Sequence, residues 1–308
     1  MPPTEDDTPP AGNEKESPHV RYGKLLLKAA VTALLVWLVF RKVDFRETAR
    51  IFTESSPGWI IAALAVYFVS LLLSTHRSNL FLKDVGIDLD YPSGLSLYLQ
   101  GGIYNIVLPG GIGGDGYKIL VLNRSKGTPY RKILFAFLLE RVSGLWAICF
   151  WLTVLGFLVP LPIIAPLQLA AAFSAGTIVY RFVLRRFFRE HAYGFVRKHL
   201  VSIGVQAFVM GGVSCLLLSQ GVWREQPPYL FAFQSSTILS VLNIGLSGLG
   251  IREFAMSYAS DVLKTSASLS VFVASSFWLL SLVAVLPGLY FLYREDSTFG
   301  RRDDGPVP

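Results

Sequence analysis

The chain has 308 residues, of which 52% are hydrophobic and only 16% are charged, and its mean hydropathy is +0.49. This composition excludes an ordinary water-exposed globular domain and predicts an all-α polytopic membrane protein. The net charge of +7 does not indicate a nucleic-acid partner, because the basic residues lie in short loops beside apolar segments, where they set orientation and meet anionic lipid.

We expect one membrane domain, 21–295, between two tails. The first tail, 1–20, is rich in Pro, Asp and Glu and lacks the basic start and cleavage site of a signal peptide, and 296–308 is similarly polar. Between the tails, about eight segments are apolar enough to enter the ~30 Å hydrocarbon core as helices. They are 25–40, 58–75, 94–108, 133–159, 163–184, 199–219, 229–248 and 267–293.

The distribution of Lys and Arg predicts how these segments are oriented. The loops 118–132 and 185–198 are the most basic and should be cytoplasmic. Segments 94–108 and 229–248 either cross the membrane or are re-entrant broken helices. The re-entrant arrangement places more basic residues inside, although it leaves four of them, at 41–50, outside. It predicts a bacterial inner-membrane protein with both termini in the cytoplasm.

Two segments of the chain match each other without a gap. Residues 105–115 read N-I-V-L-P-G-G-I-G-G-D, and residues 243–253 read N-I-G-L-S-G-L-G-I-R-E. Such internal similarity is typical of transporters built from inverted repeats, here approximately 94–159 and 229–293. The matched pairs are Asn105 with Asn243, Ile106 with Ile244, Leu108 with Leu246, Gly110 with Gly248, and Asp115 with Glu253.

Glycine and proline in these segments predict broken helices that line a polar cavity. A break frees backbone N–H and C=O groups, which within a membrane need partners in the protein or in water. The freed N–H groups would suit a lipid phosphate or carboxylate. Asp115 and Glu253 either cap the following helix or serve the substrate path. The candidate binding residues at the breaks are Asn105, Pro109, Gly110, Gly113, Gly114, Asp115, Asn243, Gly248, Arg252 and Glu253.

A second group of charges lies inside apolar segments. Glu140 and Arg141 are adjacent, so their side chains point in different directions on a helix and each needs a partner elsewhere. Each of the two charges fits a buried structural ion pair about as well as a contact to the substrate. Arg77 reads as a headgroup anchor at the membrane interface. The partners we expect are Asp115 or Glu253 for Arg141, and Arg252 or Arg77 for Glu140.

Several other patterns are not expected to carry chemistry. The G-x-G-x-x-G string at 111–116 has no preceding strand, so it does not predict a dinucleotide site. Cys149 and Cys215 lie in apolar segments and read as packing residues. The four histidines lack the spacing of metal ligands, so we expect no metal site. No catalytic motif occurs either, and we expect neither a cofactor nor enzymatic activity.

Three motifs in order resemble one family. They are L-P-G-G-I-G-G-D-G-Y at 108–117, L-L-E-R-V-S-G-L at 138–145 and S-G-L-G-I-R-E at 247–253. Together they resemble the transmembrane region of lysylphosphatidylglycerol synthases, including the flippase half of the multiple peptide resistance factor, over essentially 20–295. The resemblance implies lipid translocation. Many relatives have an arginine soon after the acid, where this chain has Tyr117 with Lys118 beside it.

The leading hypothesis is therefore a flippase-like lipid transporter. Its partner would be an anionic or aminoacylated phospholipid or a lipid-linked sugar. Arg141 and Arg252 would hold the phosphate, while the acids Asp115, Glu140 and Glu253 would attract a cationic headgroup or carry protons. The alternatives are an accessory subunit of a separately encoded glycosyltransferase or synthase, and a membrane-embedded transferase. No synthase domain is recognised in this sequence, so aminoacyl transfer is not expected.

Overall fold

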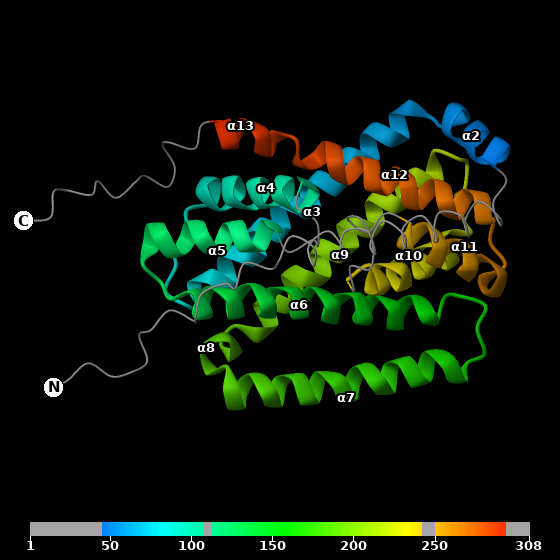
Figure 1. Ribbon diagram of the computed structural model, residues 1–308. Helices are drawn as coiled ribbons and strands as arrows, with labels where there is room; N and C mark the ends of the chain where they lie inside the picture. The colour runs from blue at the N-terminus through cyan, green and yellow to red at the C-terminus, as the bar shows by residue number, and fades with distance from the viewer. Residues whose placement is uncertain (1–44, 108–112, 242–249, 294–308) are drawn as a thin grey trace, which may run out of the picture.

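The computed structural model describes residues 45–107, 113–241 and 250–293, and all regular secondary structure within these ranges is helical (Figure 1). The helices are α2 Phe45–Glu54, α3 Pro57–Lys83, α4 Tyr91–Val107, α5 Gly113–Lys126, α6 Tyr130–Gly156, α7 Ile164–Phe187, α8 Arg189–Ala192, α9 Phe195–Leu218, α10 Gln226–Val241, α11 Ile251–Leu263, α12 Ala267–Val285 and α13 Pro287–Tyr293. The expected all-α architecture is confirmed for these residues.

Five stretches of the described chain are long and apolar enough to cross a membrane: α3, α6, α7, α9 and the α12–α13 stretch Ala267–Leu292. By contrast, α4 has 17 residues and α10 has 16, which is short for a spanning helix of about 20. The expected segment 25–40 and both expected tails lie outside the described residues. The predicted helix at 58–75 is longer than expected, because α3 continues to Lys83.

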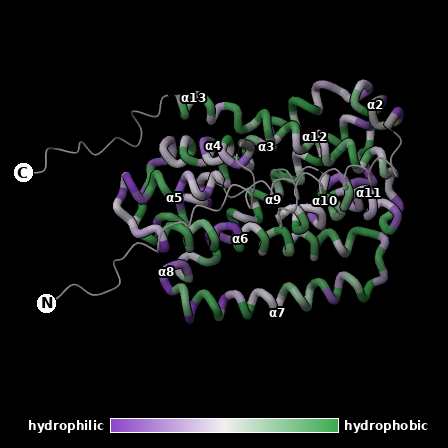
Figure 2. Tube along the Cα trace, viewed as in Figure 1, coloured by the Kyte–Doolittle hydropathy of each residue, from purple (hydrophilic) through white to green (hydrophobic). Residues whose placement is uncertain are grey.

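The centre of the bundle is formed by α3 and α9, which pack along much of their length. A small residue favours this approach, because a Cβ on Gly211 of α9 would lie 3.0 Å from Val66 Cγ1 on α3. In contrast, α7 packs mainly on α6 and leaves most of its surface uncovered. Figure 2 shows hydrophobic residues along α7 and α12, while hydrophilic residues are frequent around α5 and α8. This is the pattern expected where lipid covers the outer surface.

Two helical hairpins pack within this bundle, α4 with α5 and α10 with α11. In the first, α5 runs back along α4, and the Tyr117 hydroxyl donates a hydrogen bond to Gln100 Oε1 over 2.8 Å. In the second, α11 runs back along α10, and the Tyr229 hydroxyl accepts from the Ser266 backbone N–H over 3.0 Å. Figure 1 shows the α4–α5 and α10–α11 hairpins at opposite ends of the bundle.

Each hairpin is followed by a long helix, α6 after the first and α12 after the second. A pair of short helices followed by a long helix thus occurs twice in the described part of the chain. Two lysines differ from their expected places, however. Lys118 and Lys198, which we assigned to cytoplasmic loops, lie within α5 and α9 and are 7% and 4% exposed.

Candidate functional site

The first hairpin is held closed at the start of α5. The Asn105 side-chain oxygen on α4 accepts a hydrogen bond from the Gly114 backbone N–H over 2.9 Å. This N–H belongs to the first turn of α5, where no backbone carbonyl of the helix can accept it. A Cβ on Gly114 would lie 2.0 Å from the Gly101 carbonyl oxygen, so the close approach of the two helices requires glycine there. Two predicted site residues thus serve the closure of the hairpin.

Asp115 forms the centre of a charged cluster. Its carboxylate lies 2.8 Å from Lys118 Nζ and 2.6 Å from both Arg141 Nε and Arg141 Nη2. The side chains of Asp115 and Lys118 are 13% and 9% exposed, whereas that of Arg141 is 48% exposed. Lys118 Nζ also lies 4.2 Å from the centroid of the Phe137 ring. The cluster therefore has a buried side and an accessible side, and Arg141 occupies the accessible side.

A second ion pair lies on the neighbouring position of α6. Arg77 Nη2 on α3 donates to Glu140 Oε1 over 3.2 Å, with side-chain exposures of 10% and 7%. The other two nitrogens of Arg77, Nε and Nη1, are buried and have no hydrogen-bond partner among the described residues. Gly144, one turn along α6, gives the guanidinium its space, since a Cβ there would lie 3.2 Å from Arg77 Nη1.

These two pairs answer the question that the sequence posed for Glu140 and Arg141. Of the partners considered, Glu140 takes Arg77 and Arg141 takes Asp115. The placement of Arg77 as an interface anchor is wrong, because its side chain is buried between helices instead of reaching the surface. Through these two pairs, the adjacent residues Glu140 and Arg141 link α6 to both α3 and α5.

The second hairpin uses its acid differently. Glu253 Oε2 accepts a hydrogen bond from the Gly250 backbone N–H over 2.8 Å, which caps α11. Its Oε1 lies 3.4 Å from the Ser275 hydroxyl on α12. The capping reading of this residue is therefore correct, whereas its counterpart Asp115 is engaged by cations. Asn243, Gly248, Pro109 and Gly110 lie outside the described residues.

Arg252, next to Glu253, is held by aromatic rings. Its guanidinium carbon lies 4.9 Å from the Phe233 ring centroid and 5.0 Å from that of Phe277. Its Nε atom is buried and has no hydrogen-bond partner in the part of the chain that the structure describes. Phe277 also packs edge-on against Tyr67 of α3, which links the second hairpin to the central helix.

One charged cluster was missed from the sequence. The Asp84 carboxylate at the end of α3 pairs with His191 Nδ1 over 2.7 Å and with the Lys198 ammonium. Lys198 also donates to the backbone carbonyl of Tyr193 over 2.8 Å. The three groups tie α3, α8 and α9 together. Their separation of over a hundred residues leaves no local signal in the sequence.

The charged side chains around α6 include one more cation than carboxylates. The buried cations Arg77 and Lys118 and the half-exposed Arg141 lie beside two carboxylates, Asp115 and Glu140. This positive charge, together with the buried Nε and Nη1 donors of Arg77 that have no partner among the described residues, favours an anion such as a phosphate. Among the described residues, no group of three or more His, Cys, Asp or Glu side chains could hold a metal ion.

Comparison with protein families tests the family membership that the three sequence motifs suggested. Residues 25–288 match the family model described as the lysylphosphatidylglycerol synthase TM region. The chain belongs to this family. The match spans both hairpins and the charged cluster, and it covers the described helices from α2 to the start of α13. No curated protein and no solved structure matches the chain.

Proposed function

We propose that this family member moves a phospholipid or a lipid-linked headgroup between the two leaflets of the membrane. The observation that carries the proposal is the Arg77 guanidinium, which is buried beside Glu140 with two nitrogen atoms that lack a partner among the described residues. Leaving a buried donor unpaired costs about 1–3 kcal/mol. A phosphate oxygen would satisfy both donors, and the membrane supplies phosphates at high concentration.

The Asp115 cluster would act as the entry to this site. Arg141 is half exposed and can reach an incoming headgroup, while Lys118 is buried behind it. When the phosphate approaches Arg141, Asp115 remains paired with Lys118, so no carboxylate is left alone in a region of low dielectric. A cationic group on the lipid could instead approach Asp115 or Glu140.

The two hairpins would supply the path. In this proposal both are re-entrant and open to opposite sides of the membrane, with their breaks meeting near its middle, as in other transporters with inverted repeats. Their opposite placement in Figure 1 and the shortness of α4 and α10 support this arrangement. Acyl chains would stay in the lipid while the headgroup passes between the hairpins.

Leaflet exchange of a fluorescent phosphatidylglycerol in proteoliposomes tests the proposal. We expect the wild-type chain to accelerate exchange and the double variant Asp115→Asn/Glu253→Gln to lose most of that acceleration. Asp88→Asn is the matched control, because Asp88 pairs with Lys83 at a site where the side chains are 73% and 65% exposed. Unchanged exchange in the double variant would contradict the mechanism. No exchange by the wild type, together with a co-purifying enzyme, would favour the accessory-subunit alternative.

A further inference from the structure

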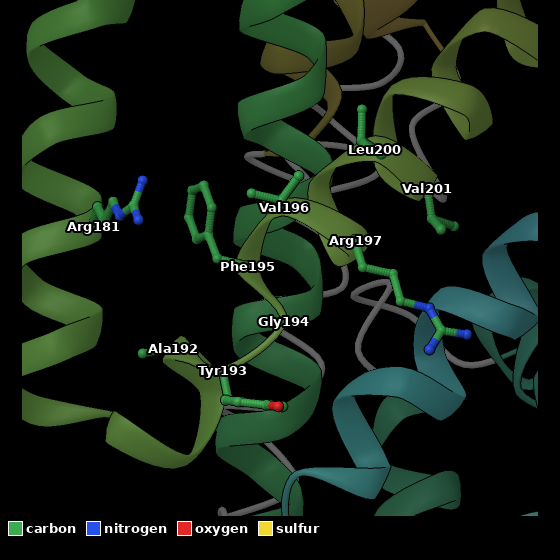
Figure 3. Close-up of a pocket in the computed structure, with 9 residues that line it drawn as sticks. All are labelled: Arg181, Ala192, Tyr193, Gly194, Phe195, Val196, Arg197, Leu200 and Val201. Atoms are coloured by element: carbon green, nitrogen blue, oxygen red, sulfur yellow. The ribbon is translucent and has the colours of Figure 1, made fainter.

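A hollow lies on the outside of the bundle, between α7 and the start of α9 (Figure 3). It is far from the hairpin breaks in sequence and contains none of the residues discussed for transport. Its wall is mainly apolar: Val196 and Leu200 are 62% and 60% exposed. The lining residues are Arg181, Ala192, Tyr193, Gly194, Phe195, Val196, Arg197, Leu200 and Val201.

Arg181 is the unusual member of this hollow. It lies in α7, six residues before the end of that candidate membrane span, which is about 9 Å along the helix axis. No carboxylate of the described residues lies within ion-pair distance of its guanidinium. Its guanidinium carbon lies over the face of the Phe195 ring, 5.6 Å from the ring centroid. A charge at this depth without a protein counter-charge requires an anion or water from the membrane interface.

The surroundings of the hollow favour an anion. Between 181 and 198 the chain has five Lys or Arg residues besides Arg181, and Glu190 is the one acid. The five are Arg185, Arg186, Arg189, Arg197 and Lys198. Lys198 is neutralised by Asp84, but the arginines are exposed. A basic end of a lipid-facing helix attracts anionic headgroups, with about 1 kcal/mol for each Lys or Arg near the surface.

We propose that this hollow binds one anionic phospholipid, with its phosphate on Arg181 and an acyl chain along Val196 and Leu200. The site fits both halves of such a molecule, since a guanidinium lies next to an exposed apolar wall that is open to the surrounding membrane. Bound there, the lipid would fill the space between α7 and α9, where few protein contacts hold α7. The inference is independent of the transport proposal.

Arg197 offers a matched control within the same hollow. Figure 3 shows the Arg181 side chain pointing toward Phe195, whereas the Arg197 side chain points away from both. Each substitution, Arg181→Gln or Arg197→Gln, removes one positive charge from one lining residue. A general loss of electrostatic attraction would affect both variants equally, whereas a built phosphate site would affect Arg181→Gln alone.

Native mass spectrometry of the purified chain, titrated with dioleoyl phosphatidylglycerol or dioleoyl phosphatidylcholine, measures this binding. We expect one tightly retained phosphatidylglycerol, lost roughly tenfold more readily from Arg181→Gln than from the wild type or Arg197→Gln. Circular dichroism checks that both variants fold alike. If folding of Arg181→Gln fails, Arg181→Lys, which keeps the charge, should retain the lipid preference. Equal retention by the two Gln variants, or equal retention of phosphatidylcholine, would overturn the proposal.

Discussion

Arg77 on α3 donates a hydrogen bond to Glu140 on α6 over 3.2 Å, and Nε and Nη1 of the same guanidinium are buried without a partner among the described residues. The neighbouring Arg141 turns to Asp115 on α5. Two adjacent positions of one helix thus connect the central helix of the bundle and the first hairpin. The predictions below separate what these charges contribute to folding from what they contribute to transport.

The Arg77–Glu140 pair should contribute to stability only as a pair. Arg77→Gln or Glu140→Gln alone leaves one buried charge without its counter-charge, which costs about 3–5 kcal/mol. The double variant removes both charges and should recover much of that loss. Thermal unfolding in detergent measures the three Tm values. A double variant as unstable as the sum of the single variants would show that the two residues do not act together.

Asp115 and Arg141 should differ in their effects on stability, although they contact each other. Asp115→Asn leaves the buried Lys118 without a carboxylate, so its Tm should fall markedly. Arg141→Gln removes a half-exposed side chain, and its effect on stability should be within about 1 kcal/mol. Both substitutions should slow leaflet exchange. A Tm for Arg141→Gln as low as that of Asp115→Asn would contradict this assignment.

Gly114→Ala should open or destabilise the first hairpin. The added Cβ would lie 2.0 Å from the Gly101 carbonyl oxygen and 2.8 Å from Asn105, so α5 must move away from α4. The control is Gly116→Ala, because a Cβ there meets nothing within 4 Å and alanine is the better helix former by about 1 kcal/mol. We expect a lower Tm for the first variant and an equal or higher one for the second; the reverse order would rule out this packing.

Glu253 offers a way to separate capping from charge. A glutamine at this position can still accept the hydrogen bond from the Gly250 N–H, so Glu253→Gln should keep the wild-type Tm. Glu253→Ala loses the cap and should be destabilised by about 1 kcal/mol. If the charge also serves transport, Glu253→Gln should keep the wild-type Tm but should catalyse leaflet exchange more slowly. A stable variant with wild-type exchange would leave Glu253 with the capping role alone.

The sequence predicted the all-helical architecture of the described residues, because apolar length is a local signal, whereas the two predicted breaks fall at 108–112 and 242–249, outside those residues. It also supplied the right short set of partners for Glu140 and Arg141, since a charge inside an apolar helix has few possible counter-charges. The matched acids, however, were expected to be equivalent. They differ because Lys118 and Arg141 reach Asp115, whereas Glu253 turns back to the Gly250 N–H.

The contacts that could not be predicted depend on how distant helices pack. Lys118 and Lys198 read as loop charges, and only the folded arrangement buries them against Asp115 and Asp84. Arg77 read as a surface anchor because α3 was expected to end before it; the helix continues to Lys83 and carries Arg77 into the bundle. Hydropathy alone cannot distinguish a charged residue that faces lipid headgroups from one that faces another helix.

The most direct test of the account is leaflet exchange by Arg77→Gln/Glu140→Gln, measured in proteoliposomes with a fluorescent phosphatidylglycerol. The double variant leaves no buried charge alone, so it should remain folded, yet it lacks the unpaired guanidinium donors. We predict a Tm within a few degrees of the wild type and a loss of most protein-dependent exchange. Wild-type exchange by this folded variant would contradict the claim that Arg77 holds the lipid phosphate during transport.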